Sequence, residues 1–300
     1  MGLLSGSVSI TRFNITKFPK KPDFERAAFR EIPEGSEVRL SRGFLPLELD
    51  EPFEFGHRRW AFRVRIDRVR PDATLVKERF RQLVKTELDS GAEFVGPKMR
   101  KQLRALAEEE IVVRTSPTSR IIEGAIDGPE LYIASTAKNQ IGIVLEVLRE
   151  IGIVAEPKAP WTDRDQPEIE SVISAHEPGQ SVLGARFLKE MWGDAELTIE
   201  PESGFVRLQT SDTKVTLSGG VGHEMMHFME HEAEITNAKL TTGEVSFRFD
   251  ALAFSVSNLR IDTERFDHWT NTLDARLEKI GEVFDLLEAK FEEAVELMTV

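Results

Sequence analysis

The C-terminal part of the chain carries an apolar pattern with the period of an α-helix. From about Glu264 to Met298 the apolar positions recur in alternating steps of four and three, and they are Leu273, Leu277, Ile280, Phe284, Leu287, Phe291, Ala294 and Met298. This spacing predicts one long helix with a continuous apolar stripe. The stripe must be covered, either by the body of the chain, as in a core helix, or by a second chain, as in an oligomer contact or a structural partner protein. The sequence leaves both alternatives open.

Strand patterns fill much of the remaining sequence. The clearest runs from Arg58 to Val69, where Trp60, Phe62, Val64 and Ile66 alternate with polar residues. Further strands are predicted near 7–15, 38–40, 53–55, 120–126, 130–135, 195–200, 204–210, 213–217, 233–240, 244–250 and 252–261, and helices near 22–29, 73–89, 97–111, 138–151, 181–192 and 222–230. We therefore expect an α+β fold of mixed or antiparallel sheets with flanking helices. A Pro- and Asp-rich stretch suggests three regions, 1–160, 161–262 and 263–300.

Composition excludes several classes of protein. Hydrophobic residues make up 40% of the 300 residues, which is enough for a substantial core. The chain has no cysteine, so it has no disulfide framework, thiolate zinc site or cysteine nucleophile. We find neither a signal-peptide pattern nor an apolar run long enough to span a membrane, and we expect a cytoplasmic protein without a membrane partner.

Charge is distributed unevenly along the chain. The formal net charge is −13, yet residues 57–104 contain 14 Lys or Arg against 6 Asp or Glu. Residues 261–300 contain 4 basic against 11 acidic residues. A local basic surplus of this kind lets one surface meet a polyanion while the rest of the protein stays acidic.

The basic residues in this region recur with the periods of the elements that carry them. The predicted strand has Arg59, Arg63 and Arg65 on its polar face, the helix at 73–89 has Lys77, Arg81 and Lys85, and the helix at 97–111 has Lys98, Lys101 and Arg104. We predict that they form one track that binds double-stranded DNA through phosphates, without reading sequence. The alternative is a solvated face paired with the chain's own carboxylates.

Both helices also carry apolar faces, and these are predicted to pack. In the first the apolar residues are Leu75, Val76, Phe80, Leu83, Val84 and Leu88, with Asp72 as the N-cap; in the second they are Met99, Leu103 and Leu106.

A competing hypothesis rests on the segment His223-Glu224-Met225-Met226-His227. This is a formal H-E-x-x-H pattern, which on a helix can place two imidazoles on a zinc ion with the Glu as general base. Glu230 and Ala233 stand where a longer zinc-protease motif needs Gly and His. A third ligand would have to come from His231, Glu232, Glu234 or Glu244. The alternative function is therefore a zinc metallohydrolase using His223 and His227, against a plain surface or packing helix.

Other catalytic signals are weak or absent. The chain has no phosphate-binding or nucleophile-elbow motif. The carboxylates Asp163, Asp165, Glu168 and Glu170 fit a solvated acidic loop better than a divalent-ion site, and His57 and His176 fit loop residues. We expect a protein that is not an enzyme, with no cofactor and no metal.

The order of several segments resembles the bacterial RdgC recombination-associated proteins. The segments are SVSITRFNI, the Gly-Phe-Leu-Pro turn at 43–46, the basic strand with its two helices, EEEIVVRTSPTSRIIEGAIDGPELYIASTAKN, VAEPKAPW, SVLGARFLKEMW and GFVRLQTSD. The resemblance spans nearly the whole chain and is closest over 94–150 and 204–262.

The resemblance implies a curved, multi-lobed protomer that pairs into a ring-like homodimer. Such a ring would encircle double-stranded DNA, restrain RecA-dependent homologous recombination and be associated with the nucleoid. Arg114 matches a basic loop position near a dimer contact and joins the DNA-binding candidates on that ground. The family's pattern continues there with an aromatic anchor, whereas this chain has Ser116-Pro117.

Overall fold

The computed structural model has an α+β fold, as predicted. It describes residues 2–162, 171–175, 177–191, 194, 196–199, 204–231, 233–243, 245–264 and 266–298. The helices are α1 (Ala73–Asp89), α2 (Pro97–Val112), α3 (Lys138–Glu150), α4 (Leu183–Glu190), α5 (Gly222–Glu230), α6 (Trp269–Met298) and a 3-10 turn at Phe24–Ala27. The strands are β1 (Ser7–Lys17), β2 (Leu40–Pro46), β3 (Glu54–Gly56), β4 (Arg59–Arg68), β5 (Thr118–Asp127), β6 (Glu130–Ile133), β7 (Val154–Pro157), β8 (Thr198–Ile199), β9 (Gly204–Gln209), β10 (Lys214–Gly219), β11 (Glu234–Thr242), β12 (Val245–Asp250) and β13 (Ser255–Arg260).

The chain divides into two compact units that are nested rather than consecutive. The first unit comprises residues 1–22, 46–62 and 122–300, and the second comprises 23–45 and 63–121. Strands β4 and β5 run through both units. The predicted boundaries after residues 160 and 262 both fall inside the first unit. Local composition does not reveal that the chain leaves one unit and returns to it.

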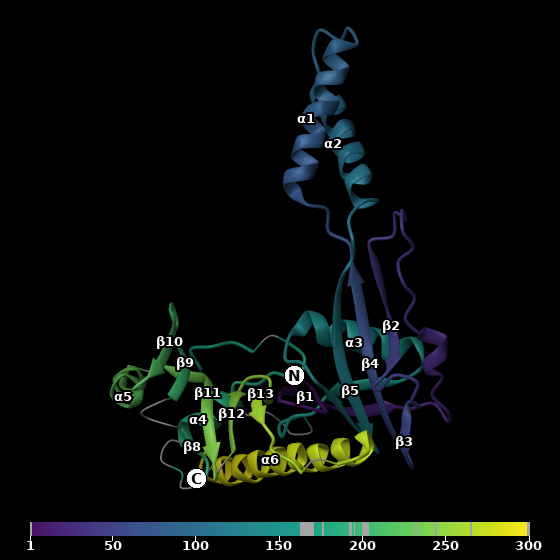
Figure 1. Ribbon diagram of the computed structural model, residues 1–300. Coiled ribbons are helices and arrows are strands. Elements are labelled where there is room, and N and C mark those ends of the chain that lie inside the picture. Colours follow the sequence, from purple (N-terminus) through teal and green to yellow (C-terminus); the bar gives the residue numbers. More distant parts are fainter. Residues whose placement is uncertain are drawn as a thin grey trace. The chain divides into compact units, whose positions relative to one another are not determined.

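The first unit is built on an antiparallel sheet, with α4 and α6 on one face. Its strands pair in the order β10-β9-β11-β12-β13-β1-β6, with β8 added to β11 and β7 to β1 (Figure 1). The aromatic rings of Phe187 in α4, Phe249 in β12 and Phe291 in α6 meet at centroid distances of 5.7 to 6.0 Å. Helices α4 and α6 therefore cover the same apolar face of the sheet.

The long predicted helix is confirmed, and its stripe lies in the core of its own chain. Leu273, Leu277, Ile280, Phe284, Leu287, Phe291 and Ala294 are all buried, while the side chain of Met298 lies outside the described residues. The ring of Phe291 lies 5.5 Å from that of Trp161, centroid to centroid. Of the two alternatives for this stripe, the structure has the core helix.

A buried arginine fastens the N-terminal segment to α6. Arg276 donates hydrogen bonds to the carbonyl oxygens of Leu3 at 2.6 Å, Ile261 at 2.9 Å and Gly6 at 2.7 Å. Its side chain is removed from water, and this burial lowers the pKa of the guanidinium. The backbone carbonyls replace the water that this cation loses.

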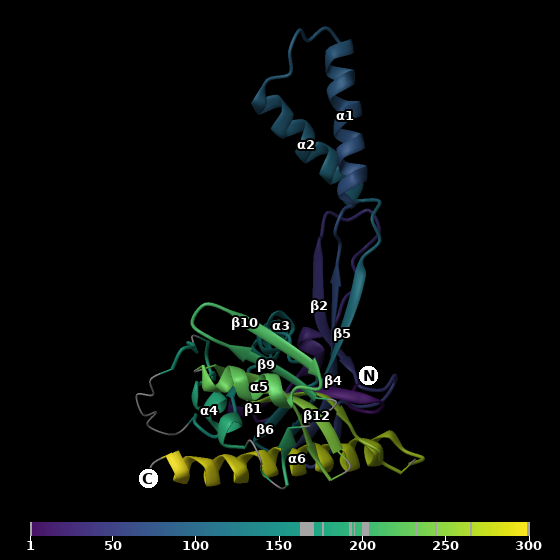
Figure 2. The same cartoon turned by 90° about the vertical axis from the view of Figure 1, so that its left-hand side faces the viewer.

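The second unit holds the α1/α2 hairpin, and both predicted helices are confirmed. The Asp72 carboxylate caps α1 by accepting from the amides of Thr74 at 2.7 Å and Leu75 at 3.1 Å, and Pro97 occupies the first turn of α2. The Arg79 guanidinium joins the helices through Glu110, with distances of 2.5 and 3.2 Å. Figure 2 shows the two helices diverging toward the loop that connects them.

Candidate nucleic-acid interface

Two of the predicted cations on the strand β4, Arg59 and Arg65, form ion pairs with carboxylates of the protein itself. Arg59 lies 3.0 Å from Asp127 and 2.8 Å from Asp274, and its guanidinium lies over the ring of Phe55 at 4.7 Å. Ion pairs on both sides and the aromatic ring hold the side chain in place, with 26% of it exposed. Arg59 therefore stabilises the first unit and offers little charge to a ligand.

Arg65 is held in the same manner in the second unit. Its Nε and Nη2 atoms donate to the two carboxylate oxygens of Asp67 at 2.9 and 2.8 Å, and the guanidinium lies over the ring of Phe29 at 4.5 Å. Burial acts to raise the pKa of Asp67, but the hydrogen bonds from Arg65 and Ser119 outweigh it and lower the pKa. Arg63 is half-buried on the same strand.

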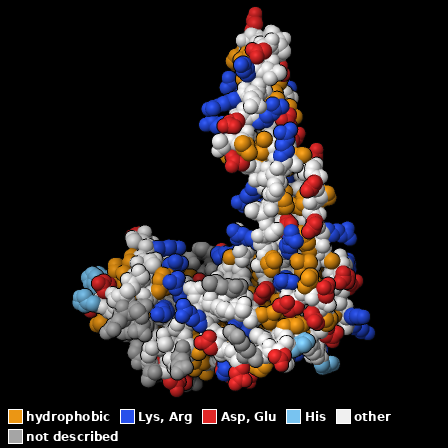
Figure 3. Space-filling view, in the orientation of Figure 1, with side chains coloured by type: hydrophobic (Ala, Val, Ile, Leu, Met, Phe, Trp, Pro, Cys, Tyr) orange, Lys and Arg blue, Asp and Glu red, His pale blue; other side chains and the backbone are white. Residues whose placement is uncertain are grey.

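The predicted cations on α1 and α2 differ from those on β4 in exposure and in pairing. Lys77, Arg81 and Lys85 of α1 and Lys98, Lys101 and Arg104 of α2 are all exposed. Within the described part of the chain none of them forms an ion pair or a side-chain hydrogen bond. Figure 3 shows basic side chains along the hairpin. These six predicted residues keep their charge available for an external anion.

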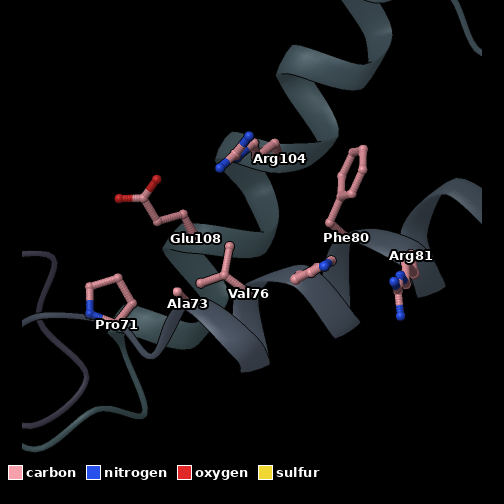
Figure 4. A pocket seen from close by; sticks show the side chains of 8 residues that line it. Pro71, Ala73, Val76, Phe80, Arg81, Arg104 and Glu108 are labelled. Carbon is pink, nitrogen blue, oxygen red and sulfur yellow. The ribbon is translucent and has the colours of Figure 1, made fainter.

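A cavity brings the cations of the two helices together. It has a volume of about 680 Å³ and lies between α1 and α2. Lys77 and Arg81 from α1 and Arg104 from α2 line it, with Val76 and Phe80 as apolar lining (Figure 4). Glu108 also lines the cavity, but its carboxylate pairs with Arg39 at 2.7 Å. The structure thus places part of the predicted track at one site. Arg59 belongs to the other unit.

The apolar faces of the hairpin are covered less than the sequence predicts. No residue of α1 is buried, and Leu75 and Leu88 are 50% and 45% exposed. In α2 Leu103 is buried, whereas Met99 and Leu106 are 41% and 42% exposed. The prediction of a core face on α1 is therefore wrong: its apolar residues have the period of a helix, but these two helices shield each other only in part.

Arg114 follows the end of α2. Its side chain is exposed, and together with Ser116 and Pro117 it lines a cavity of about 340 Å³. Its positive charge helps to lower the pKa of Glu110, whose main cause is the hydrogen bond from Arg79. Arg114 therefore interacts electrostatically with the Arg79–Glu110 pair that joins α1 and α2.

The H-E-x-x-H segment forms the helix α5. His223, Glu224 and His227 are exposed, and the Nδ1 atom of His231 lies 2.8 Å from the carbonyl oxygen of His227. Glu234 is buried and accepts a hydrogen bond from Ser171 at 2.7 Å. Among the described residues no three potential ligands gather around a metal position. Glu232 and Glu244 lie outside the described residues, as do Asp163, Asp165, Glu168, Glu170 and His176.

Three further exposed arginines lie outside residues 57–104. Arg207, Arg248 and Arg260 are exposed on β9, β12 and β13, and none of them forms an ion pair within the described part of the chain. They were not among the predicted site residues because no local surplus of charge marks them. The signal was the strand alternation in FVRLQ, SFRFD and SNLR, which puts each arginine on the face opposite the core.

Comparisons with known proteins add no relative. No protein-family model matches the chain, and no curated protein matches it. None of the described helices combines the length and apolar character that crossing a membrane requires.

Proposed function

We propose that the protein binds double-stranded DNA without reading its sequence, through the cations of the α1/α2 hairpin. The observation that carries this proposal is the contrast in pairing: Arg59 and Arg65 are engaged by carboxylates, while the six helix cations are exposed and have no ion pair with any described residue. Unpaired Lys and Arg side chains at helical intervals release counterions when they meet phosphates, and this release drives non-specific binding.

The wider proposal draws on the resemblance to the RdgC proteins. The protein acts as a ring-like homodimer in the cytoplasm, associated with the nucleoid, and restrains RecA-dependent homologous recombination without catalysing a reaction. The order of segments along the sequence supports this part, together with Arg114 at the position of a dimer contact.

The first experiment is a duplex-DNA titration over a range of salt concentrations. We compare wild type with the triple variant Lys77→Glu/Arg81→Glu/Lys85→Glu. Each phosphate contact contributes about 0.9 to the slope of log affinity against log salt, so the variant is expected to lose a slope of roughly 3 and on the order of a hundredfold in affinity.

The matched control carries the same charge change in the first unit. Lys17, Lys20 and Lys21 are exposed and lie outside the hairpin, so Lys17→Glu/Lys20→Glu/Lys21→Glu is expected to keep most of the affinity. Equal losses in the two triple variants would mean that net charge, not the hairpin, governs binding. Absence of salt-sensitive duplex binding by the wild type would refute the proposal.

The assembly and the effect on recombination need separate measurements. Light scattering coupled to gel filtration is expected to give twice the mass of the 33.9 kDa chain. In a RecA strand-exchange assay the wild type is expected to slow product formation, and the hairpin triple variant is not. A stable monomer would contradict the ring, and inhibition by both proteins alike would separate RecA control from DNA binding.

A further inference from the structure

A second group of exposed arginines lies beside an aromatic ring on the face of the first unit's sheet opposite α4 and α6. Phe205 of β9 is half-buried, and the Arg248 guanidinium of β12 lies over its ring at 4.1 Å. Arg207, two residues further along β9, lies 5.9 Å from the same ring. The neighbours of these residues along the strands, Val206, Leu208, Phe247 and Phe249, belong to the core that α4 and α6 cover, so the ring and its arginines lie on the opposite face.

This face also has a cavity whose chemistry suits an anion that carries a flat ring. The cavity has a volume of about 470 Å³ and is lined by Phe205, Arg248, Arg260, Asn258 and Ser218, among others. None of the described residues that line it is acidic. Figure 3 shows basic side chains over the β9–β12 region.

The register of the sheet concentrates positive charge at this site. Lys239 of β11 stands directly opposite Arg248 of β12. Like charges at directly opposed positions destabilise a sheet, and the described part of the chain supplies no ion pair to Arg248 or Arg260.

We propose that this face binds single-stranded nucleic acid, with an unpaired base stacked at Phe205 and Arg248 and neighbouring phosphates on Arg207 and Arg260. Sheet surfaces that combine aromatic rings, arginine planes and cations bind single strands by stacking and charge. The site lies in a different unit from the α1/α2 hairpin and does not depend on the duplex-binding proposal.

Two features favour a single strand over other polyanions. A duplex keeps its bases stacked on one another, so it cannot use the ring of Phe205. A peptide of acidic residues would satisfy the arginines, but it offers no flat ring to stack at Phe205. The amide of Asn258 and the hydroxyl of Ser218 can hydrogen-bond a base edge or a sugar.

The test is binding of a fluorescent oligothymidylate of about 12 nucleotides, measured by anisotropy in the full-length hairpin variant Lys77→Glu/Arg81→Glu/Lys85→Glu. That background removes the proposed duplex site, so failure of one proposal does not imply failure of the other. We expect salt-sensitive binding that persists in this background. Phe205→Leu is expected to weaken it by about fivefold or more, and Phe205→Tyr to keep it within about twofold, because stacking needs an aromatic ring.

The charge contribution has its own readout. Arg260→Gln is expected to reduce the salt slope for the single strand by about 0.7. The inference is overturned if the oligothymidylate does not bind, or if Phe205→Leu binds it as well as Phe205→Tyr does. It is also overturned if a hexaglutamate peptide binds with the same dependence on Phe205, since that result would assign the face to an acidic protein partner.

Discussion

Helices α1 and α6 have the same kind of apolar periodicity and opposite surroundings. Every described residue of the α6 stripe is buried, whereas no residue of α1 is. The 3.6-residue period shows that a segment is a helix and which side is apolar. It does not show whether the chain supplies a surface to cover that side. In α6 the sheet and α4 supply it. In α1 the neighbouring helix α2 covers that side only in part, because the two helices diverge (Figure 2).

The cations of α6 and α1 also differ in how far they are paired with carboxylates of the protein. Lys290 of α6 lies 3.2 Å from Asp194, 3.0 Å from Glu196 and 3.1 Å from Glu293, and the hydrogen bonds to these carboxylates raise its pKa. In α1, Lys77 and its neighbours at helical spacing have no such partners within the described residues. Lys290 of α6 is held by ion pairs within the protein, whereas Lys77, Arg81 and Lys85 of α1 remain available to a ligand.

The largest effect should come from removing one ring in each helix. Phe291→Ala is expected to lower the free energy of unfolding by about 3–5 kcal/mol because it leaves a cavity in the core. Phe80→Ala is expected to cost less than about 1 kcal/mol, since the half-exposed site stays open to water. Urea unfolding followed by tryptophan fluorescence reports the first unit, which contains all four tryptophans, and far-UV circular dichroism reports the hairpin as well. A comparable cost for Phe80 would mean that the face of α1 is covered in solution.

A buried and an exposed arginine give the second comparison. Arg276→Met removes a cation that several backbone carbonyls share, and leaving these acceptors unsatisfied should cost about 3 kcal/mol. Arg104→Met should change stability by no more than about 0.5 kcal/mol, because its guanidinium has no partner in the described chain. Urea midpoints of the two variants against wild type measure both. If Arg276→Met had the same stability as wild type, water would have to reach those carbonyls in the variant.

Local structure could be predicted from the sequence more completely than the environment of each residue. Helices 73–89 and 222–230 match the predicted bounds because Asp72 and the flanking glycines give clear signals. The strand β7 was not predicted, since Val154–Pro157 is short and follows α3 directly.

The candidate site was predicted only in part, because the sequence does not reveal which residues face each cation in the folded protein. Periodicity placed Arg65 and Arg81 on polar faces, but only the fold shows that Arg65 pairs with Asp67 and that Arg81 pairs with no carboxylate among the described residues. Phe205 and Arg248 are distant in the sequence, and only strand pairing brings them together.

The third comparison sets an arginine expected to matter for stability against one expected to matter for DNA binding. Arg65→Gln breaks the two hydrogen bonds to a buried carboxylate and should lower the free energy of unfolding of the second unit by about 1–3 kcal/mol, with little change in duplex affinity at a temperature where it remains folded. Arg81→Gln should do the reverse: unchanged unfolding and a salt slope reduced by about 0.9. Circular dichroism and the duplex titration on the same samples measure both. If Arg65→Gln weakened binding as much as Arg81→Gln, the strand would have to belong to the DNA-binding surface.

The smallest expected effect is the pH dependence of stability. It compares the pair of Arg65 with the buried Asp67 to the half-exposed pair of Arg79 with Glu110. Because the folded-state pKa of Asp67 is lowered, its contribution to stability is present above its unfolded pKa of about 3.9 and is lost as pH falls through the folded value. Wild type should therefore exceed Asp67→Asn in stability near neutral pH, and the difference should shrink in acid. Glu110 also has a lowered pKa, caused mainly by the hydrogen bond from Arg79 in a half-exposed pair, so Glu110→Gln should follow the same pH trend. The two differ in their response to salt: about 1 M NaCl screens charges within about 3 Å in water, so it should abolish the Glu110 difference and leave most of that at Asp67, whose side chain is 1% exposed. Urea midpoints across this pH range at low and high salt measure both, and equal salt sensitivity would mean that water reaches the Arg65–Asp67 pair.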